Sequence, residues 1–152
     1  MAEDRRTHLK IHFKLDKDED GYPPDDWEGI WAQEVAPGLY RIDNIPFFVR
    51  GISCDDIVSA SVEGDELEFK ELVQPSGNSV LRIIAVDKSG VGKLREQLRQ
   101  MQCESELSDI PGFLSVEVPA IVNIDPILNF LAAGEEEGRW EYEEGSIRHP
   151  HP

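Results

Sequence analysis

The chain has 152 residues and a formal net charge of −16, with 31 acidic side chains against 15 lysines and arginines. A field of this sign repels phosphate backbones and anionic membranes, so we expect neither a nucleic acid nor a membrane as a partner. The same field attracts basic proteins and speeds their encounter with the chain, although acidity also serves solubility alone.

Strands dominate the first half of the chain. Residues 8–15 alternate between apolar and polar side chains, which predicts a half-buried strand. Turn signals at Pro37-Gly38 and Glu63-Gly64-Asp65 each separate two apolar segments, which predicts two hairpins. Short strands with tight turns favour a small, strongly bent sheet or barrel over residues 8–75. The strands expected here are residues 8–15, 30–35, 39–43, 57–62 and 66–73.

Helical spacing appears only in the second half. Its elements are expected to be strand 79–86, helix 90–102 with Ser89 as N-cap, edge strand 103–108, strand 113–118, a helix capped by Asp125 with Pro126 next and ending at Gly134 or Gly138, and a strand with Trp140 and Tyr142. This order matches the split-βαβ plan. We therefore expect an α+β protein with a ferredoxin-like βαββαβ subdomain over residues 78–147 and a disordered tail over residues 148–152.

The segment between the first two strands resembles a calcium loop. Asp16, Asp18 and Asp20 alternate before Gly21, as at the start of an EF-hand loop. The twelfth position, which needs a bidentate Glu, is Trp27, and the segment before the loop alternates like a strand instead of a helix. We interpret the stretch as an acidic turn, and weak calcium binding by its carboxylates remains the alternative.

Other chemical motifs are incomplete. Residues 89–93, SGVGK, partly match a phosphate loop, but Asp87 stands where glycine is needed and Leu94 where Ser or Thr is needed. His8 and His12 lie about 13 Å apart on one strand, too far for one ion. No histidine falls in a recognisable catalytic arrangement, so we expect no enzyme, no cofactor and no metal.

The cysteines and the apolar segments indicate in which cellular compartment to expect the protein. Cys54 and Cys103 match neither a disulfide framework nor a zinc site, so we expect two reduced packing residues. The start, MAEDRRTH, lacks the apolar core of a secretory signal, and no apolar run approaches the roughly 18 residues of a membrane span. We therefore expect a cytoplasmic protein.

Two segments combine aromatic side chains with charge. In residues 40–53, YRIDNIPFFVRGIS, an apolar run lies between Arg41 and Arg50, which predicts a core crossover; an aromatic surface with arginine anchors is the alternative. Residues 135–144, EEEGRWEYEE, form either an edge strand with its aromatics turned inward or an acidic patch with aromatic anchors for a basic protein. The candidate partner-binding residues are Asp18, Asp20, Trp27, Arg50, Glu137, Arg139, Trp140, Glu141, Tyr142 and Glu143.

The chain resembles a known family in DEDGYPP, in YRIDNIPFFVRGIS with the following Asp55-Asp56-Ile57-Val58, and in GRWEYEE. These segments are similar to a bacterial domain-of-unknown-function family, number 4265, from about residue 8 to residue 147. The resemblance brings no catalytic residues, and small bacterial proteins of such families are sometimes immunity partners of secreted toxins. We therefore expect a non-catalytic module that binds a basic protein, most concretely an immunity protein covering a basic toxin domain. The alternative is a small-ligand or metal-responsive module using a cleft between the two subdomains.

Overall fold

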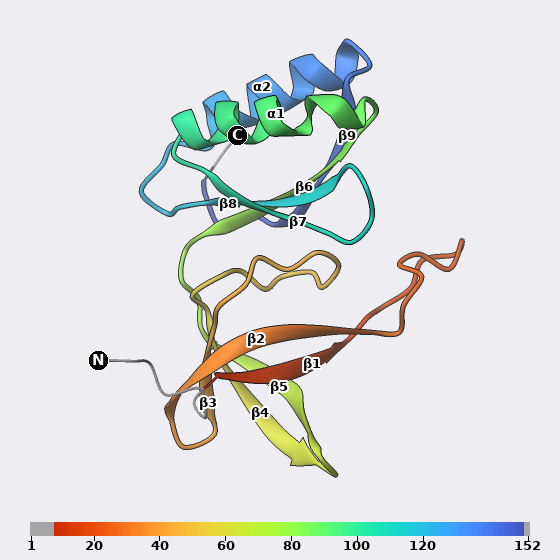
Figure 1. Cartoon of the computed structure of the whole chain (residues 1–152). Helices are drawn as coiled ribbons and strands as arrows, with labels where there is room; N and C mark the ends of the chain where they lie inside the picture. Colours follow the sequence, from red (N-terminus) through yellow and green to blue (C-terminus); the bar gives the residue numbers. More distant parts are fainter. Residues whose placement is uncertain (1–7, 151–152) are drawn as a thin grey trace. The chain divides into compact units, whose positions relative to one another are not determined.

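The computed structural model describes residues 8–150 and is drawn in Figure 1. The chain divides into two compact units, residues 1–76 and residues 77–152, called here the barrel unit and the layered unit. Strands make up the barrel unit, and the layered unit adds two α-helices. The predicted α+β class is therefore confirmed.

The barrel unit is a closed barrel in which neighbouring strands follow chain order. Each consecutive pair is antiparallel, and the last strand returns to the first as a parallel neighbour, with Ile11 opposite Leu67. The closing pair must be parallel because every odd-numbered strand of such a meander runs in the same direction. The strands are β1 (His8–Lys14), β2 (Trp27–Ala36), β3 (Leu39–Ile42), β4 (Ile57–Glu63) and β5 (Glu66–Gln74).

The alternation along β1 determines the core of the barrel. Ile11 and Phe13 are fully buried, whereas Lys10 and Lys14 point outward. The Phe13 ring stacks on that of Phe69, with centroids 4.7 Å apart. Each such buried side chain contributes about 1.5–3 kcal/mol. The other buried members of this core are Ile30, Ala32, Tyr40, Ile42, Ile52 and Val58.

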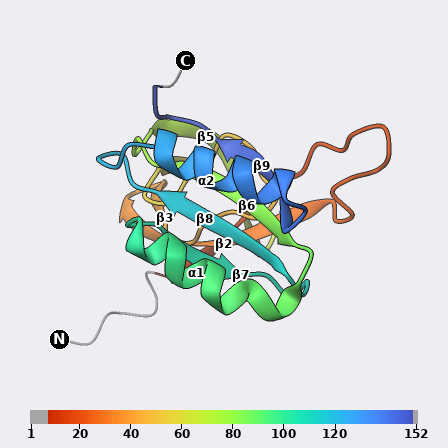
Figure 2. The same cartoon turned by 90° about the horizontal axis from the view of Figure 1, so that it is seen from above.

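The layered unit is an antiparallel sheet with the strand order β7-β8-β6-β9 and both α-helices on one face (Figures 1 and 2). Apolar side chains from that face of the sheet and from the helices form one buried cluster, to which Leu81, Leu98 and Leu131 belong. The elements are β6 (Ser79–Ala85), a 3₁₀ turn (Lys88–Gly90), α1 (Val91–Gln100), β7 (Glu104–Leu107), β8 (Phe113–Val118), α2 (Asp125–Glu136) and β9 (Trp140–Ser146).

Both helices begin differently from the prediction. Ser89 does not cap α1: its N–H and hydroxyl donate to Oδ1 of Asp87 at 3.0 and 2.7 Å, and these bonds lower the pKa of Asp87. Asp125 lies inside α2, and its N–H donates to Oδ1 of Asn123 at 3.1 Å. The N-cap positions are occupied by Gly90 in α1 and by Ile124 in α2, and neither helix has a side-chain hydrogen bond at its cap, so both N-cap predictions are wrong.

The remaining boundaries show how tertiary pairing extends the elements. β2 begins at Trp27, before the predicted start at residue 30, because Trp27 pairs with Lys14 of β1. α2 continues through Gly134 and ends before Gly138, whose φ of 77° is the left-handed conformation common after a helix. Both cysteines are free thiols, and burial raises the pKa of Cys103 to about 11. Within residues 8–150, no helix has the length and apolarity needed to cross a membrane.

Candidate functional site

The acidic loop between β1 and β2, residues 15–26, is organised around the ammonium group of Lys17. Lys17 Nζ donates to the carbonyl oxygen of Pro23 at 2.7 Å, and the carbonyl oxygens of Pro24 and Asp25 both lie 3.2 Å away. The carboxylate of Asp26 is 3.4 Å from the same nitrogen. Lys17 therefore brings to these oxygens the positive charge that a bound cation would otherwise bring.

The aspartates of the acidic loop form a turn. Oδ1 of Asp18 accepts the backbone N–H groups of Asp20 and Tyr22 at 2.9 and 3.0 Å, and Gly21 has a φ of 80°. Such a side-chain bond to the backbone two residues ahead is typical of aspartate in turns. These contacts support the acidic-turn interpretation. Asp18 and Asp20 are both exposed.

Glu28 is a structural carboxylate that sequence reasoning missed. It accepts three successive backbone N–H groups, from Phe47 at 2.7 Å, Phe48 at 3.0 Å and Val49 at 2.8 Å. This arrangement holds the segment between β3 and β4 against β2. Phe47 and Phe48 are both half-buried, and the Phe48 ring meets the Tyr22 ring edge-on at 6.0 Å. The segment is therefore neither a fully buried core crossover nor an open aromatic surface; it combines features of both predicted alternatives.

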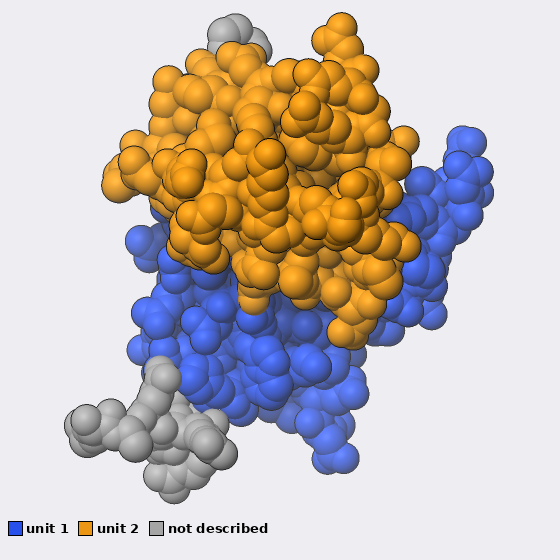
Figure 3. All heavy atoms as spheres, turned by 45° about the horizontal axis from the view of Figure 1, so that its top comes forward, with its two compact units in different colours: residues 1–76 blue, residues 77–152 orange. Residues whose placement is uncertain are grey.

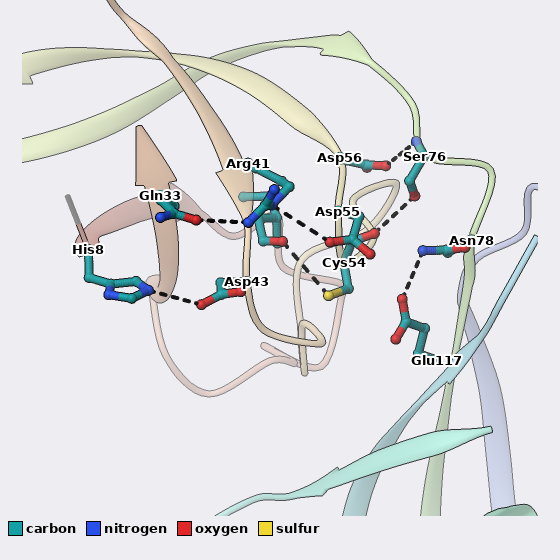
Figure 4. A network of polar contacts seen from close by, with 11 residues as sticks. His8, Gln33, Arg41, Asp43, Cys54, Asp55, Asp56, Ser76, Asn78 and Glu117 are labelled. Atoms are coloured by element: carbon teal, nitrogen blue, oxygen red, sulfur yellow. Dashed lines mark hydrogen bonds and ion pairs between the residues drawn. The ribbon is translucent and has the colours of Figure 1, made fainter. Parts of the chain in front are cut away.

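Asp56 is a second carboxylate that serves the backbone (Figure 4). It is fully buried, and its two oxygens accept the N–H groups of Ser53 and Ser76, each at 2.8 Å. The Ser76 hydroxyl donates to the carbonyl oxygen of Cys54 at 2.9 Å. Asp56 therefore joins the loop before β4 to the last residue of the barrel unit.

In contrast to the buried Asp56, the carboxylates around the end of α2 and the start of β9 are exposed to solvent. Arg139 lies among them and pairs with Glu137 at 2.8 Å. The acidic side chains in the last turn of α2 lie at the negative end of the helix dipole. That turn contains no basic residue to compensate them. Burial, and then the charges of Glu135 and Glu144, raise the pKa of Tyr142. We call acidic cluster the exposed residues Glu135, Glu136, Glu137, Glu141 and Glu144.

Glu143 has a partner inside its own unit. Its carboxylate lies 3.6 Å from Nη1 of Arg82, whose side chain is only 2% exposed, while that of Glu143 is 37% exposed. Gly145 allows this arrangement, because a Cβ there would lie 2.9 Å from the guanidinium carbon of Arg82. Glu143 therefore neutralises a buried cation and is less available to a partner than Glu141.

Trp140 is a core residue, so the prediction that it anchors a partner is wrong. It is 6% exposed, and its indole N–H donates to the carbonyl oxygen of Leu131 at 2.8 Å. Its ring packs 5.4 Å from the ring of Phe130. A Cβ on Gly134 would lie 1.9 Å from Cζ2 of Trp140, so the glycine leaves the space that the indole fills. Of the two sequence alternatives, the inward-facing one holds for Trp140.

His149 also corrects a prediction, because the sequence assigns residues 148–152 to a disordered tail. Nδ1 of His149 lies 2.6 Å from the Ser79 hydroxyl, and Nε2 lies 2.8 Å from the carbonyl oxygen of Pro119. The Pro119 carbonyl only accepts, so Nε2 donates to it. In the neutral imidazole Nδ1 is then the acceptor of the Ser79 hydroxyl, whose oxygen also accepts the backbone N–H of Arg148 at 2.8 Å. Ser79 is fully buried, which fits a structural tie better than a nucleophile. His151 and Pro152 lie outside the described residues.

A pocket of about 360 Å³ opens in the layered unit where β6 ends, α1 begins and β9 starts. Its charged lining residues are Asp87, Lys93 and Arg139. Lys93 comes from the SGVGK segment, whose glycines the sequence assigns to a turn between strand and helix. The volume lies in the range of small-molecule sites, but the carboxylate of Asp87 opposes a phosphate there.

The candidate residues fall in both units, which are coloured separately in Figure 3. Asp18, Asp20, Trp27 and Arg50 belong to the barrel unit; Trp27 is 43% exposed and Arg50 is exposed. The structure brings the others together around the end of α2 and β9. These are Glu137, Arg139, Trp140, Glu141, Tyr142 and Glu143.

Comparisons with known proteins give a family and a fold. The family model described as a domain of unknown function, DUF4265, matches residues 28–142. A crystal structure of a hypothetical protein from Neisseria gonorrhoeae is similar over 92% of this chain and 95% of that one, with a TM-score of 0.76 and 22% identity. At this identity the likeness concerns the fold alone. No curated protein matches the chain.

Proposed function

We propose, for a chain that belongs to the DUF4265 family, that it is a non-catalytic module which binds a basic protein through the acidic cluster. The observation that carries this proposal is the set of exposed carboxylates around the end of α2 and the start of β9. They can meet lysines and arginines of a partner and orient its approach.

The position of the acidic cluster supports a binding role over simple solubility. Carboxylates at the C-terminal end of a helix are unfavourable by about 0.3–1 kcal/mol each, and like charges one turn apart repel. Solubility can be served equally by acids placed elsewhere. A cationic partner surface would convert this repulsion into attraction. Charge pairs would then steer and orient the partner, and half-buried Tyr142 is the aromatic side chain in this region that can add apolar contact.

The most concrete version is an immunity protein that covers a basic toxin domain inside bacterial cytoplasm. The net charge of −16 favours rapid capture of such a domain. An inhibitory contact of this kind should reach the standard size of about 1,600 Å².

Co-expression with the product of the adjacent gene tests the proposal. We expect co-purification and rescue of growth, with association slowed about tenfold at low salt when Glu137, Glu141 and Glu144 become lysine. A control variant changes the exposed residues Asp65, Glu66 and Glu71 of the barrel unit to lysine. Both variants change the net charge equally. If the partner binds at the acidic cluster, the cluster variant must therefore associate with it much more slowly than the control variant does. Equal rates, or neither co-purification nor rescue, would remove this function.

The alternative function is a small-ligand or metal-responsive module. The observation that favours it is the pocket of about 360 Å³, which lies within the layered unit and is lined by Lys93 and Arg139. A thermal-shift panel of amino acids, sugars and nucleotides would test it, with Lys93→Glu as the variant that should abolish a stabilising hit. A panel without any hit in the wild type would count against the alternative.

We also infer that the layered unit is ferredoxin-like. Two features support this inference: its first strand, β6, lies between β8 and β9, and each α-helix precedes an edge strand of the same sheet.

A further inference from the structure

The outward side of β1 and β2 differs in charge from the rest of this acidic chain. On β1 the outward side chains are His8, Lys10, His12 and Lys14. The positions paired with them on β2 are Gln33, Trp31, Gly29 and Trp27. Within these two described strands no outward position of a pair carries a carboxylate, although the chain has 31 acidic residues. We call this set of positions the cationic face.

Two tryptophans stand exposed on the cationic face. Trp27 and Trp31 are 43% and 47% exposed, whereas Trp140 is buried in the layered unit. They are four residues apart on one strand, about 13 Å. Tryptophan is the residue type most enriched among the energetic centres of protein interfaces, because one side chain can bury a large apolar area at a low entropic cost.

Lys10 packs against one of the two tryptophans. Its side chain crosses Gly29, where a Cβ would lie 2.7 Å from Lys10 Cε. Its ammonium group lies over the Trp31 ring, 5.4 Å from the centroid. Among residues 8–150 the contact that holds the ammonium group is this cation–π contact and not a carboxylate, so the charge remains available to an anionic ligand.

The backbone of β1 is not available for strand addition. β1 pairs with β2 on one side and with β5 on the other, where Glu68 lies opposite His12 and bounds the cationic face. A ligand must therefore be recognised by side chains alone. At one end of the face His8 is already paired with a carboxylate, since its Nε2 lies 3.4 Å from Oδ2 of Asp43 (Figure 4). The lysines and the two indole rings are the part of the face that complements an acidic ligand carrying apolar groups.

We propose that the cationic face binds an acidic peptide segment of a partner protein, whose carboxylates meet Lys10 and Lys14 while its apolar side chains cover Trp27 and Trp31. A peptide fits better than a nucleic acid. A short segment needs only a few carboxylates at the lysines, whereas a nucleic acid strand brings a phosphate with every nucleotide into the field of a chain with a net charge of −16. This surface is opposite in charge to the acidic cluster, so it serves a different contact.

Selection from a random dodecapeptide library on phage tests the proposal, because it samples acidic and basic peptides alike and does not require the partner to be identified. We expect the wild-type protein to enrich peptides rich in Asp and Glu that contain apolar residues. A synthetic copy of the most enriched peptide should bind about tenfold more weakly to Trp31→Ala and to Lys10→Glu. Val62→Ala and Lys88→Glu are matched controls at exposed positions outside the cationic face, and both should bind within about twofold of wild type.

Circular dichroism of each variant confirms that the fold is intact before binding is compared. No enrichment of acidic peptides, or an affinity that is equal in Trp31→Ala and the controls, would overturn the proposal. A fluorescent oligothymidylate is the second probe. If it binds the wild type more tightly than the peptide and loses affinity in Lys10→Glu, the face binds nucleic acid and the peptide proposal fails.

Discussion

The acidic loop and the acidic cluster are alike in sequence and different in structure. In the loop, Lys17 gathers backbone carbonyls and Asp26, and Asp18 accepts backbone N–H groups. In the cluster, the carboxylates are exposed at the end of α2 and on β9; Glu137 pairs with Arg139, and Glu135 accepts the N–H of Tyr142 at 3.2 Å. Local acidity therefore says little about binding. The useful question is how far the fold uses each carboxylate to hold its own backbone.

The same contrast applies to aromatic residues and gives the largest expected effect. Trp140→Ala should lower the free energy of unfolding by about 3–5 kcal/mol, because it empties the space beside Gly134 and removes the bond to Leu131. Trp31→Ala, on the exposed cationic face, should cost less than about 1 kcal/mol. Urea denaturation of both variants measures the difference. If both variants lost a similar free energy of unfolding, the assignment of Trp140 to the core and of Trp31 to the surface would be wrong.

A neighbouring pair of aspartates separates internal from displayed carboxylates. Asp56→Asn should lower the free energy of unfolding by about 2–4 kcal/mol, because one amide cannot accept from both Ser53 and Ser76 through two oxygens. Asp55→Asn is the control: its carboxylate is exposed and lies 3.9 Å from Arg41 (Figure 4), and asparagine tolerates its φ of 70°. The control should change stability by less than about 0.5 kcal/mol. Equal effects would contradict the internal role of Asp56.

The protein should become more stable when the acidic cluster is made less acidic. Glu136→Lys places a cation in the last turn of α2 and should raise the free energy of unfolding by about 0.3–1 kcal/mol at low salt. The gain should shrink as salt rises, and Glu136→Gln should show a smaller gain. A stability that falls in the lysine variant would show that the cluster is not self-repelling.

The smallest expected effect concerns calcium at the acidic loop. Because Lys17 already brings positive charge to its oxygens, millimolar calcium should leave the thermal midpoint within about 1 °C of that measured with chelator. Magnesium serves as the control for ionic strength. A calcium-specific rise of more than about 5 °C would make the loop a metal site after all.

Local patterns identify most elements of this fold. Alternation predicts β1, helical spacing predicts α1 and α2, and turn residues place the hairpins. These signals depend on neighbours a few residues apart. The predicted N-caps, Ser89 and Asp125, each lie next to the observed cap residue, because the N–H groups of Ser89 and Asp125 bond to the side chains of Asp87 and Asn123 outside the helices.

The candidate site was harder to predict, since its contacts span long stretches of chain. Alternation places Trp140 on one side of β9 but cannot say which side is covered; that depends on Gly134 leaving room for the indole. Glu28 reaches backbone groups 19 to 21 residues away, and no sequence motif marks such an acceptor. The cationic face was open to prediction from the lysines and histidines of β1, but its tryptophans required the register with β2.

The parallel pair that closes the barrel also sets an order of events during synthesis. β1 can form its hairpin with β2 early, but its other edge must wait for Leu67 and Glu68, near the far end of the barrel unit. Until then a strand rich in apolar side chains has an unpaired edge, which is a point of misassembly. Such long-range closure is slow. A ribosome stalled before residue 67 would therefore hold an open barrel, so pausing there should increase aggregation or chaperone binding.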